Sequence, residues 1–318
     1  MDFVGLECYA LGMKKFDVIV IGGGPAGLTA GIYAVRGGAK TLLIEREFCG
    51  GQMVSTGEIE NYTGFEKITG PELAMQMSAH AETAGVEISY ENITSVDLKS
   101  KTIQTEEEQY QAKAIIIATG AKPRKLGCEG EEESINRGVH FCGICDGAMY
   151  RDKDIIVVGG GNSAVEEVLY LSTMAKSVTI VNITPDFNAE EANLKQLKVL
   201  KNLTAVHHNH IVKSVNFPII TIQKVGKDFE PVPDALTELS ADAVFVAIGR
   251  VPTTELFTGQ IEFDNWGYIK VDASMQTSLS GVYSAGDINS KTIRQITTAA
   301  SDGTIAALNA IHHVKNAK

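Results

Sequence analysis

The sequence lacks the features that mark membrane-spanning and secreted proteins. None of its 318 residues belongs to a run of about 20 consecutive apolar residues, the length that a membrane-spanning helix needs. Residues 1–8 lack the basic start and apolar centre of a secretory signal, so we expect a cytoplasmic protein that does not bind membranes. Only five cysteines occur, and this odd, sparse set excludes a framework of structural disulfides.

Basic residues are also scarce. Lys and Arg number 28 against 39 Asp and Glu, which leaves a formal net charge of −11. Nucleic acids and anionic membranes are polyanions that reward clustered positive charge, so this balance argues against binding to either. We interpret the acidic runs Glu106–Glu108 and Glu131–Glu133 as solvated faces or loop tips.

Glycine, by contrast, is abundant, and six residues at 22–27 carry the first clear motif. The β-branched run Phe16–Ile21 predicts a strand buried on both faces, and it ends at the turn Gly22–Gly27. A helix is predicted over 28–36 and a second strand over 39–45, which ends in Glu45. Glycines let the backbone approach a pyrophosphate at the helix start, and the acid can bind a ribose hydroxyl. This unit therefore predicts a dinucleotide site.

The same pattern returns 137 residues later. Asp154–Ala164 aligns with Asp17–Gly27 without a gap, a helix follows over 165–171, and a strand follows over 177–182. Asn182 stands where the first unit has Glu45, so the acid that selects an unphosphorylated ribose is replaced by an amide. The repeat predicts an α/β fold with two Rossmann-like domains, each a three-layer ββα arrangement.

Further elements are predicted around these two units. Residues 86–90, 93–98 and 102–105 have the pattern of short strands in a meander, and 114–121 and 243–248 are two buried strands. Small and apolar residues recur at three- and four-residue steps from Arg294 to Val314, which predicts a long helix.

Cys142 and Cys145 are the two cysteines close enough in sequence to form a site, and Asp146 follows directly. A lone Cys-x-x-Cys is either a redox pair or half of a zinc site. His140 and the group His207–His210 lack zinc-ligand spacing, so we expect no metal and a surface loop near 207. Thiol-disulfide exchange needs a neighbour that can exchange a proton, a role that suits Asp146. We interpret Cys8, Cys49 and Cys128 as incidental thiols.

In these motifs the chain resembles the low-molecular-weight thioredoxin reductases from about residue 14 onward. The resemblance rests on the following motifs: Gly22–Gly27, Gly51-Gln52, Glu60-Asn61-Tyr62, Ala118–Ala121, Cys142–Gly147, Gly159–Ala164, Gly286-Asp287 and Arg294-Gln295-Ile296. The cysteine pair inside the second dinucleotide unit is the distinguishing mark of that family.

The resemblance implies two domains, the second inserted in the first. It implies an FAD-binding domain over 14–123 plus 252–318 and an NAD(P)-type domain over 124–251 that carries the cysteine pair. The residues expected around FAD are Gly22, Gly24, Pro25, Ala26, Gly27, Glu45, Gly51, Gln52, Asn61, Ala118, Thr119, Gly120, Gly286, Asp287, Arg294, Gln295 and Ile296. Those expected around a second nucleotide are Gly159, Gly161, Asn162, Ser163, Ala164 and Asn182.

The implied activity passes electrons from a reduced donor through FAD and the Cys142–Cys145 pair to thioredoxin or a thioredoxin-like protein, in a homodimeric enzyme. One departure concerns the donor. Family members that use NADPH carry His-Arg-Arg-x-x-x-Arg after the second strand of this unit, whereas this chain has Asn182-Ile183-Thr184 and then Asn188. The missing basic residues argue against a specific use of NADPH. The sequence does not decide which donor, NADPH, NADH or ferredoxin, supplies the electrons. A flavin-bound sensor without enzymatic activity is a third hypothesis.

Overall fold

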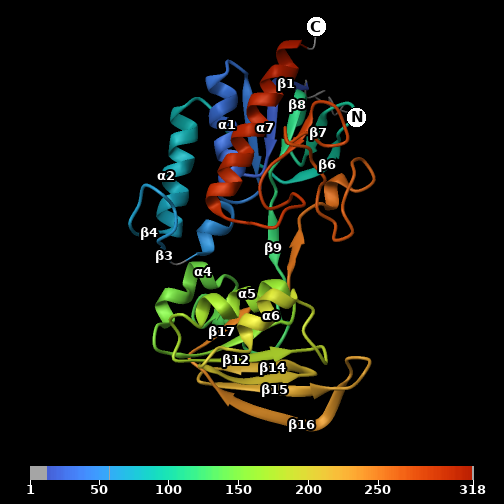
Figure 1. The fold of residues 1–318 in the computed structure, drawn as a ribbon. Helices are drawn as coiled ribbons and strands as arrows, with labels where there is room; N and C mark the ends of the chain where they lie inside the picture. Colours follow the sequence, from blue (N-terminus) through green and yellow to red (C-terminus); the bar gives the residue numbers. More distant parts are fainter. Residues whose placement is uncertain (1–12, 57, 317–318) are drawn as a thin grey trace, which may run out of the picture. The chain divides into compact units, whose positions relative to one another are not determined.

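Residues 13–56 and 58–316 are described by a computed structural model (Figure 1). Their contacts divide them into two compact units. The first comprises the described residues up to 55, residues 69–121 and residues 252–316. The second comprises residues 122–251 and the described residues between 56 and 68.

The first unit is built around a seven-stranded sheet in the order β5-β2-β1-β8-β7-β6, with β19 also paired to β8. Its strands are β1 (Lys14–Ile21), β2 (Thr41–Glu45), β5 (Glu87–Tyr90), β6 (Ile93–Asp97), β7 (Thr102–Thr105), β8 (Gln109–Ile117) and β19 (Val282–Ser284). β5, β2, β1, β8 and β19 pair in parallel, whereas β6, β7 and β8 form an antiparallel meander. β7 pairs with the beginning of β8 and β19 pairs with its end, so the nine residues of β8 are long enough for both strands.

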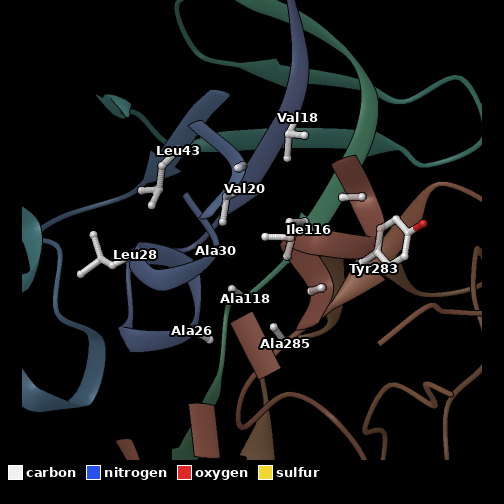
Figure 2. Packing of buried hydrophobic residues seen from close by; sticks show 14 of the residues in the cluster. Val18, Val20, Ala26, Leu28, Ala30, Leu43, Ile116, Ala118, Tyr283 and Ala285 are labelled. Atoms are coloured by element: carbon white, nitrogen blue, oxygen red, sulfur yellow. The ribbon is translucent and has the colours of Figure 1, made fainter. Parts of the chain in front are cut away.

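Helices α1 (Pro25–Arg36) and α7 (Ile296–Asn316) lie side by side in this unit (Figure 1). Their small residues allow the close approach, since a side-chain carbon at Gly303 would lie 2.2 Å from the carbonyl oxygen of Ala26. Figure 2 shows Val20 of β1 and Ile116 of β8 in the same buried cluster as Ala30 of α1. Burial of such apolar side chains is the main stabilising contribution to the unit, at about 25 cal/mol per Å².

The second unit repeats the βαβ start on a five-stranded parallel sheet, in the order β10-β17-β11-β12-β13. Its strands are β10 (Val139–His140), β11 (Asp154–Val158), β12 (Ser177–Asn182), β13 (Leu203–His208) and β17 (Ala243–Val246). Its helices are α3 (Glu131–Ser134), α4 (Gly143–Asp146), α5 (Asn162–Leu171) and α6 (Glu191–Leu197), with a 3-10 turn, η2, at Gly147–Tyr150. A separate antiparallel sheet contains β14 (His210–Asn216), β15 (Ile219–Val225) and β16 (Pro231–Ser240).

Short elements complete the chain. The connecting strands β9 (Ala121–Pro123) and β18 (Arg250–Pro252) pair with each other, as do β3 (Glu58–Ile59) and β4 (Ile68–Thr69). The remaining elements are η1 (Gly51–Ser55), η3 (Glu255–Phe257) and the helix α2 (Gly70–Thr83).

Three predictions about local structure are wrong. The strand at 86–90 does not belong to the meander: β5 pairs in parallel with β2, because the helix α2 forms a crossover between them. His207 and His208 lie on β13, not in a surface loop. Glu131 is 1% exposed, because its carboxylate accepts the backbone N–H groups of Leu126 and Gly127.

Candidate functional site

The glycine turn of the first unit leaves a helix start open to a phosphate. Gly22 has φ +104°, and a side-chain carbon there would lie 2.5 Å from the carbonyl oxygen of Ala118. At Gly27 it would lie 1.8 Å from the carbonyl oxygen of Gly22. Gly24 caps α1, with Pro25 and Ala26 in the first turn, and as a glycine it offers no side chain to cap the N–H groups there. Such unpaired groups at a helix start favour an anion.

Glu45 lies at the end of β2, directly beside this turn. Its Oε2 accepts the Gly23 N–H at 2.7 Å, and its Oε1 accepts the Arg46 N–H at 2.6 Å. The two bonds hold the carboxylate at the edge of the glycine turn, where the expected ribose hydroxyls would be its further partners.

Asp287 supplies the clearest sign of a ligand in the first unit. Its Oδ1 is buried and has no hydrogen-bond partner among the described residues. Its Oδ2 accepts a bond from Gln52 Nε2 at 3.3 Å, and the same nitrogen donates to the carbonyl oxygen of Ala121 at 3.0 Å. A buried acceptor without a donor costs about 1 to 3 kcal/mol, so a hydroxyl-bearing ligand would relieve it. Together with the open glycine turn, this fits a bound FAD.

The structure brings most of the other expected FAD residues into this same unit. Gly51 approaches Gly24, since a side-chain carbon at Gly51 would lie 3.2 Å from the Gly24 Cα. Gly286 donates its N–H to Asp302, and Arg294 donates from Nε to the carbonyl oxygen of Asp287. The remaining members are Ala118, Thr119, Gly120, Gln295 and Ile296, the last of which begins α7. Asn61, also expected near the flavin, belongs to the second unit.

The glycine turn of the second unit is hydrogen-bonded to the segment that follows β12. Gly159 has φ +143°, and Gly161 caps α5 without a side-chain cap, followed by Asn162, Ser163 and Ala164 in the first turn. The Asn188 N–H donates to the Gly160 carbonyl oxygen at 2.7 Å, and the Glu190 N–H donates to Asn162 Oδ1 at 2.6 Å. The segment after β12 therefore borders the expected nucleotide site.

Asn182 is 1% exposed, and its side-chain amide forms hydrogen bonds with the segment that follows β12. Nδ2 donates to the Asp186 carbonyl oxygen at 3.1 Å, and Oδ1 accepts from both the N–H and the hydroxyl of Thr184. The side chain is therefore engaged within the protein at the place where the first unit presents a carboxylate. Residues 183–190 contain neither Lys nor Arg.

The cysteine pair forms a disulfide on the second unit. Cys142 is the N-cap of α4, and its Sγ accepts the N–H of Cys145 at 3.2 Å. Asp146 ends the same helical turn, and its Oδ2 lies 3.3 Å from Nδ1 of the buried His140. His140 Nε2 lies 2.8 Å from the Tyr150 hydroxyl. Sequence reasoning placed Asp146 at the pair but did not give His140 or Tyr150 a role.

The other described cysteines are unsuited to exchange. Burial raises the pKa of the Cys49 thiol, and burial together with Glu131 raises that of Cys128 to about 11. Exchange needs a thiolate, so both thiols are unreactive near neutral pH. Cys8 lies outside the described residues.

One further side chain that sequence reasoning missed is Glu167 on α5. Its Oε2 accepts the N–H of Gly143 at 2.7 Å, directly after Cys142. The two residues lie 24 positions apart, and no local spacing marks such a pair. The only sequence signal was an acidic residue near the start of the predicted helix, and the neighbouring Glu166, which is exposed, gives the same signal.

No helix in the described part of the chain is long and apolar enough to cross a membrane.

Comparisons with known proteins agree with this geometry. The pyridine nucleotide-disulphide oxidoreductase family matches residues 16–303. A 34.2 kDa protein in the rubredoxin operon of Clostridium pasteurianum is 44% identical, covering 95% of this chain and 98% of the relative. The thioredoxin reductase of Listeria monocytogenes is 42% identical, covering 96% of each.

Solved structures are similar as well. The crystal structure of thioredoxin reductase from Streptococcus pyogenes is 37% identical with a TM-score of 0.85, covering 95% of this chain and 98% of that one. A ferredoxin-flavin thioredoxin reductase from Clostridium acetobutylicum is more distant, at 27% identity and a TM-score of 0.51, covering 95% and 99%. These matches confirm the predicted α/β fold class with two Rossmann-like domains. The chain belongs to the pyridine nucleotide-disulphide oxidoreductase family, within which it groups with the low-molecular-weight thioredoxin reductases.

Proposed function

We propose that this protein is an FAD-dependent thioredoxin-disulfide reductase. The observation that carries the proposal is the Cys142–Cys145 disulfide beside Asp146, on a chain that also holds an open dinucleotide turn with the unpaired Oδ1 of Asp287. FAD, when bound, accepts two electrons from a donor and delivers them to the disulfide. Residues 14–123 and 252–318 form the FAD-binding domain in this proposal, and residues 124–251 form the domain that carries the cysteine pair.

The chain's own residues perform the exchange with thioredoxin. In the reduced protein one cysteine attacks the thioredoxin disulfide as a thiolate, which gives a mixed disulfide and releases one thioredoxin sulfur. The second cysteine then attacks the mixed disulfide, restores the Cys142–Cys145 bond and releases the other sulfur. Asp146 takes up the proton of the attacking thiol and returns it to a leaving sulfur, so the reaction balances as one dithiol exchanged for another.

The residues that bind the cofactor follow from the same geometry. The first turn of α1 and the glycines at 22, 24 and 27 would hold the pyrophosphate, and Glu45 the adenosine ribose. Gln52 and Asp287 would bind hydroxyl and polar groups nearer the flavin. Asn61, Gly51, Thr119, Arg294 and Ile296 complete the proposed set.

The electron donor is best described as one without a 2′-phosphate. Asn182 is engaged internally, and Asp186 and Glu190 add negative charge to a segment without a cation. A phosphate there would lack an ionic hydrogen bond, each worth about 1.5 to 3 kcal/mol. NADH is therefore favoured over NADPH. Reduced ferredoxin is the second candidate, supported by the same missing cations.

Titration of the purified, flavin-loaded protein under anaerobic conditions distinguishes these donors. NADH, NADPH and reduced ferredoxin are added in turn, and the flavin absorbance is followed. We expect bleaching by NADH at concentrations where NADPH has little effect. Bleaching by micromolar NADPH would exclude the proposed preference, and bleaching by ferredoxin alone would establish the second candidate.

Cysteine variants test the route to thioredoxin. Cys142→Ser and Cys145→Ser should each abolish thioredoxin reduction while FAD stays bound, and Cys128→Ser, a matched control in the same unit, should retain it. A protein whose flavin is reduced by no donor and oxidised by no thioredoxin would instead be a flavin-bound sensor.

The same proposal includes a homodimer in the cytoplasm. Phe48 and Met75 of the first unit are 75% and 66% exposed and flank a hollow lined by Val54 and Tyr90, an apolar surface that suits a second copy. Light scattering at several protein concentrations measures the oligomeric state.

The cytoplasmic location is supported by the thiols of Cys49 and Cys128, which are not in disulfides and so suit a reducing compartment.

A further inference from the structure

Glu167 connects α5 to the turn that carries the disulfide. Its Oε2 accepts the N–H of Gly143 at 2.7 Å, and Gly143 is the first residue of α4, directly after Cys142. The side chain therefore reaches the backbone of the Cys-x-x-Cys segment itself, without occupying the place of either sulfur.

The same segment lies close to α5 along its length. A side-chain carbon at Gly143 would lie 1.9 Å from Glu167 Oε2, and one at Gly147 would lie 2.5 Å from Leu171 Cδ2. A side chain at either position would force the end of Glu167 or Leu171 to move. The position of α4 is consequently set by direct contact with α5, and the Gly143–Glu167 bond is the polar part of that contact.

The bond matters most when the disulfide is open. In the oxidised protein the covalent bond itself holds Cys142 and Cys145 together. After reduction that constraint is lost, and the turn keeps its shape only through its remaining contacts. The described hydrogen bonds within the turn are those from the Cys145 and Asp146 N–H groups to Cys142, and that from Gly147 to Gly143.

We propose that Glu167 is a positioning residue for thiol-disulfide exchange, which holds the Gly143 backbone so that Cys142 and Cys145 stay in register when their bond is open. The inference rests on the redox role proposed for this pair. It assigns no proton transfer to Glu167.

The charges around Glu167 bear on the strength of the bond. Burial raises the pKa of Glu167 to about 7, the charge of Asp146 on α4 and that of Glu166 on α5 act in the same direction, and the Gly143 N–H and Arg250 on β18 oppose the shift. The carboxylate accepts a stronger hydrogen bond than the neutral acid. Either form can accept, since a protonated carboxyl retains its carbonyl oxygen.

Two conservative variants separate reach from charge. Glu167→Gln keeps the length of the side chain and an acceptor oxygen but removes the charge. Glu167→Asp keeps the charge but is one methylene too short to accept from Gly143. Glu167→Ala removes both, and Glu166→Ala on the same helix is the matched control because Glu166 is exposed.

The measurement is the redox equilibrium of the Cys142–Cys145 pair against reduced and oxidised glutathione, read by trapping the free thiols. It needs no thioredoxin and no electron donor, so it is independent of the proposed activity. We expect the equilibrium constant for disulfide formation to fall at least tenfold in the Asp and Ala variants and to stay within about threefold of the wild type in the Gln variant and the control. The rate of exchange with oxidised thioredoxin should follow the same order.

Every other pattern overturns the inference. Loss in the Gln variant with retention in the Asp variant would make Glu167 an electrostatic residue. Equal losses in both, or none in any variant, would show that the Gly143 bond does not position the pair. Circular dichroism and the flavin content of each variant report on folding, and the Gln and Asp comparison decides the question if the Ala variant does not fold. Failure of the wild type to reduce thioredoxin would refute the proposed function but leave the glutathione result readable.

Discussion

The carboxylate of Asp146 lies 3.3 Å from Nδ1 of His140, a side chain that is 2% exposed. The histidine ring is also stacked on Phe245 and lies within hydrogen-bond distance of the Tyr150 hydroxyl. His140 ends the strand β10, whereas Asp146 ends the turn that carries the disulfide. The strand thus places His140 directly beside the group proposed to exchange protons with the cysteines.

Replacement of His140 should impair the exchange reaction without releasing FAD. The variant His140→Phe keeps a ring against Phe245 but removes both nitrogens, so Asp146 loses its neighbour. We expect thioredoxin reduction to fall about tenfold, which corresponds to about 1.4 kcal/mol in the barrier. Tyr150→Phe removes only the bond between the Tyr150 hydroxyl and His140 Nε2, which does not involve Asp146, and should change the rate less. Steady-state kinetics and flavin content measure both, and full activity in His140→Phe would show that Asp146 is oriented by other groups.

The raised pKa of Glu167 predicts how stability depends on pH. The folded protein retains this proton up to about pH 7, whereas the unfolded chain releases it near the ordinary value of 4.5. The folded state therefore binds more protons between these values, and this group makes the protein less stable as the pH rises through that window. Glu167→Gln cannot ionise and escapes the loss, which is at most about 3 kcal/mol.

Thermal melting of the wild type and Glu167→Gln at a series of pH values tests this expectation. The variant should gain stability relative to the wild type from about pH 5 to pH 7, and the difference should level off above that range. A difference that is the same at every pH would mean that Glu167 ionises normally.

Asp287→Ala should yield protein with little bound flavin. The substitution removes the unpaired buried Oδ1 that we assign to the cofactor, together with the acceptor of Gln52. Asp97→Asn is the matched control, since Asp97 bonds only to its neighbours Lys99 and Ser100 among the described residues, in an exposed turn of the same unit. The ratio of flavin to protein absorbance after purification measures the effect. Full flavin occupancy in Asp287→Ala would remove this residue from the proposed site.

Arginines after β12 should create a use for NADPH. Ile183 and Asn188 have exposed side chains beside the glycine turn of the second unit. In the double variant I183R/N188R, two ionic hydrogen bonds to a 2′-phosphate, at about 1.5 to 3 kcal/mol each, should raise kcat/KM for NADPH at least tenfold. The uncharged I183Q/N188Q serves as control. An unchanged ratio of NADPH to NADH use would show that the segment does not contact the adenosine end of the donor.

Glu131 and Glu132 offer a comparison of a buried with an exposed carboxylate in one acidic run. Glu131→Ala leaves the N–H groups of Leu126 and Gly127 without their acceptor, so we expect the free energy of unfolding to fall by about 3 kcal/mol. Glu132→Ala breaks an exposed ion pair with Lys125 and should cost less than about 1 kcal/mol. Urea denaturation measures both, and equal effects would contradict the role assigned to Glu131.

The motifs that sequence reasoning predicted well are those whose signal is local. The turn at Gly22–Gly27 and its repeat carry strand, glycines and helix within one short stretch, and the structure shows both βαβ units. The helix α2 was missed because few of its residues are buried, namely Gly70, Leu73, Ala74 and Ala81, and only Leu73 among them is large and apolar. Its start was nevertheless readable, since Thr69 caps the helix by accepting the N–H of Glu72.

The contacts around the disulfide could not be read in the same way. Glu167 meets Gly143 only because α5 packs on α4, and the burial of Glu131 depends on the course of the backbone at 126–127. Such contacts depend on tertiary packing, which an acidic residue does not signal by its position in the sequence. The internal bonds of Asn182 are a similar case, because an amide in that position could equally have faced a ligand.

The place of β19 in the first sheet bears on the order in which the protein is made. Val282 pairs with Ile115, and the helix α7 that follows β19 packs on α1 near the beginning of the chain. The ribosome therefore releases nearly all of the second unit before the first can complete its sheet. While translation continues, residues 115–117 of β8 lack their pairing with β19, and α1 lacks its contact with α7. A pause or truncation before residue 282 would leave these surfaces exposed to aggregation, so this part of the chain is where we expect nascent protein to need a chaperone.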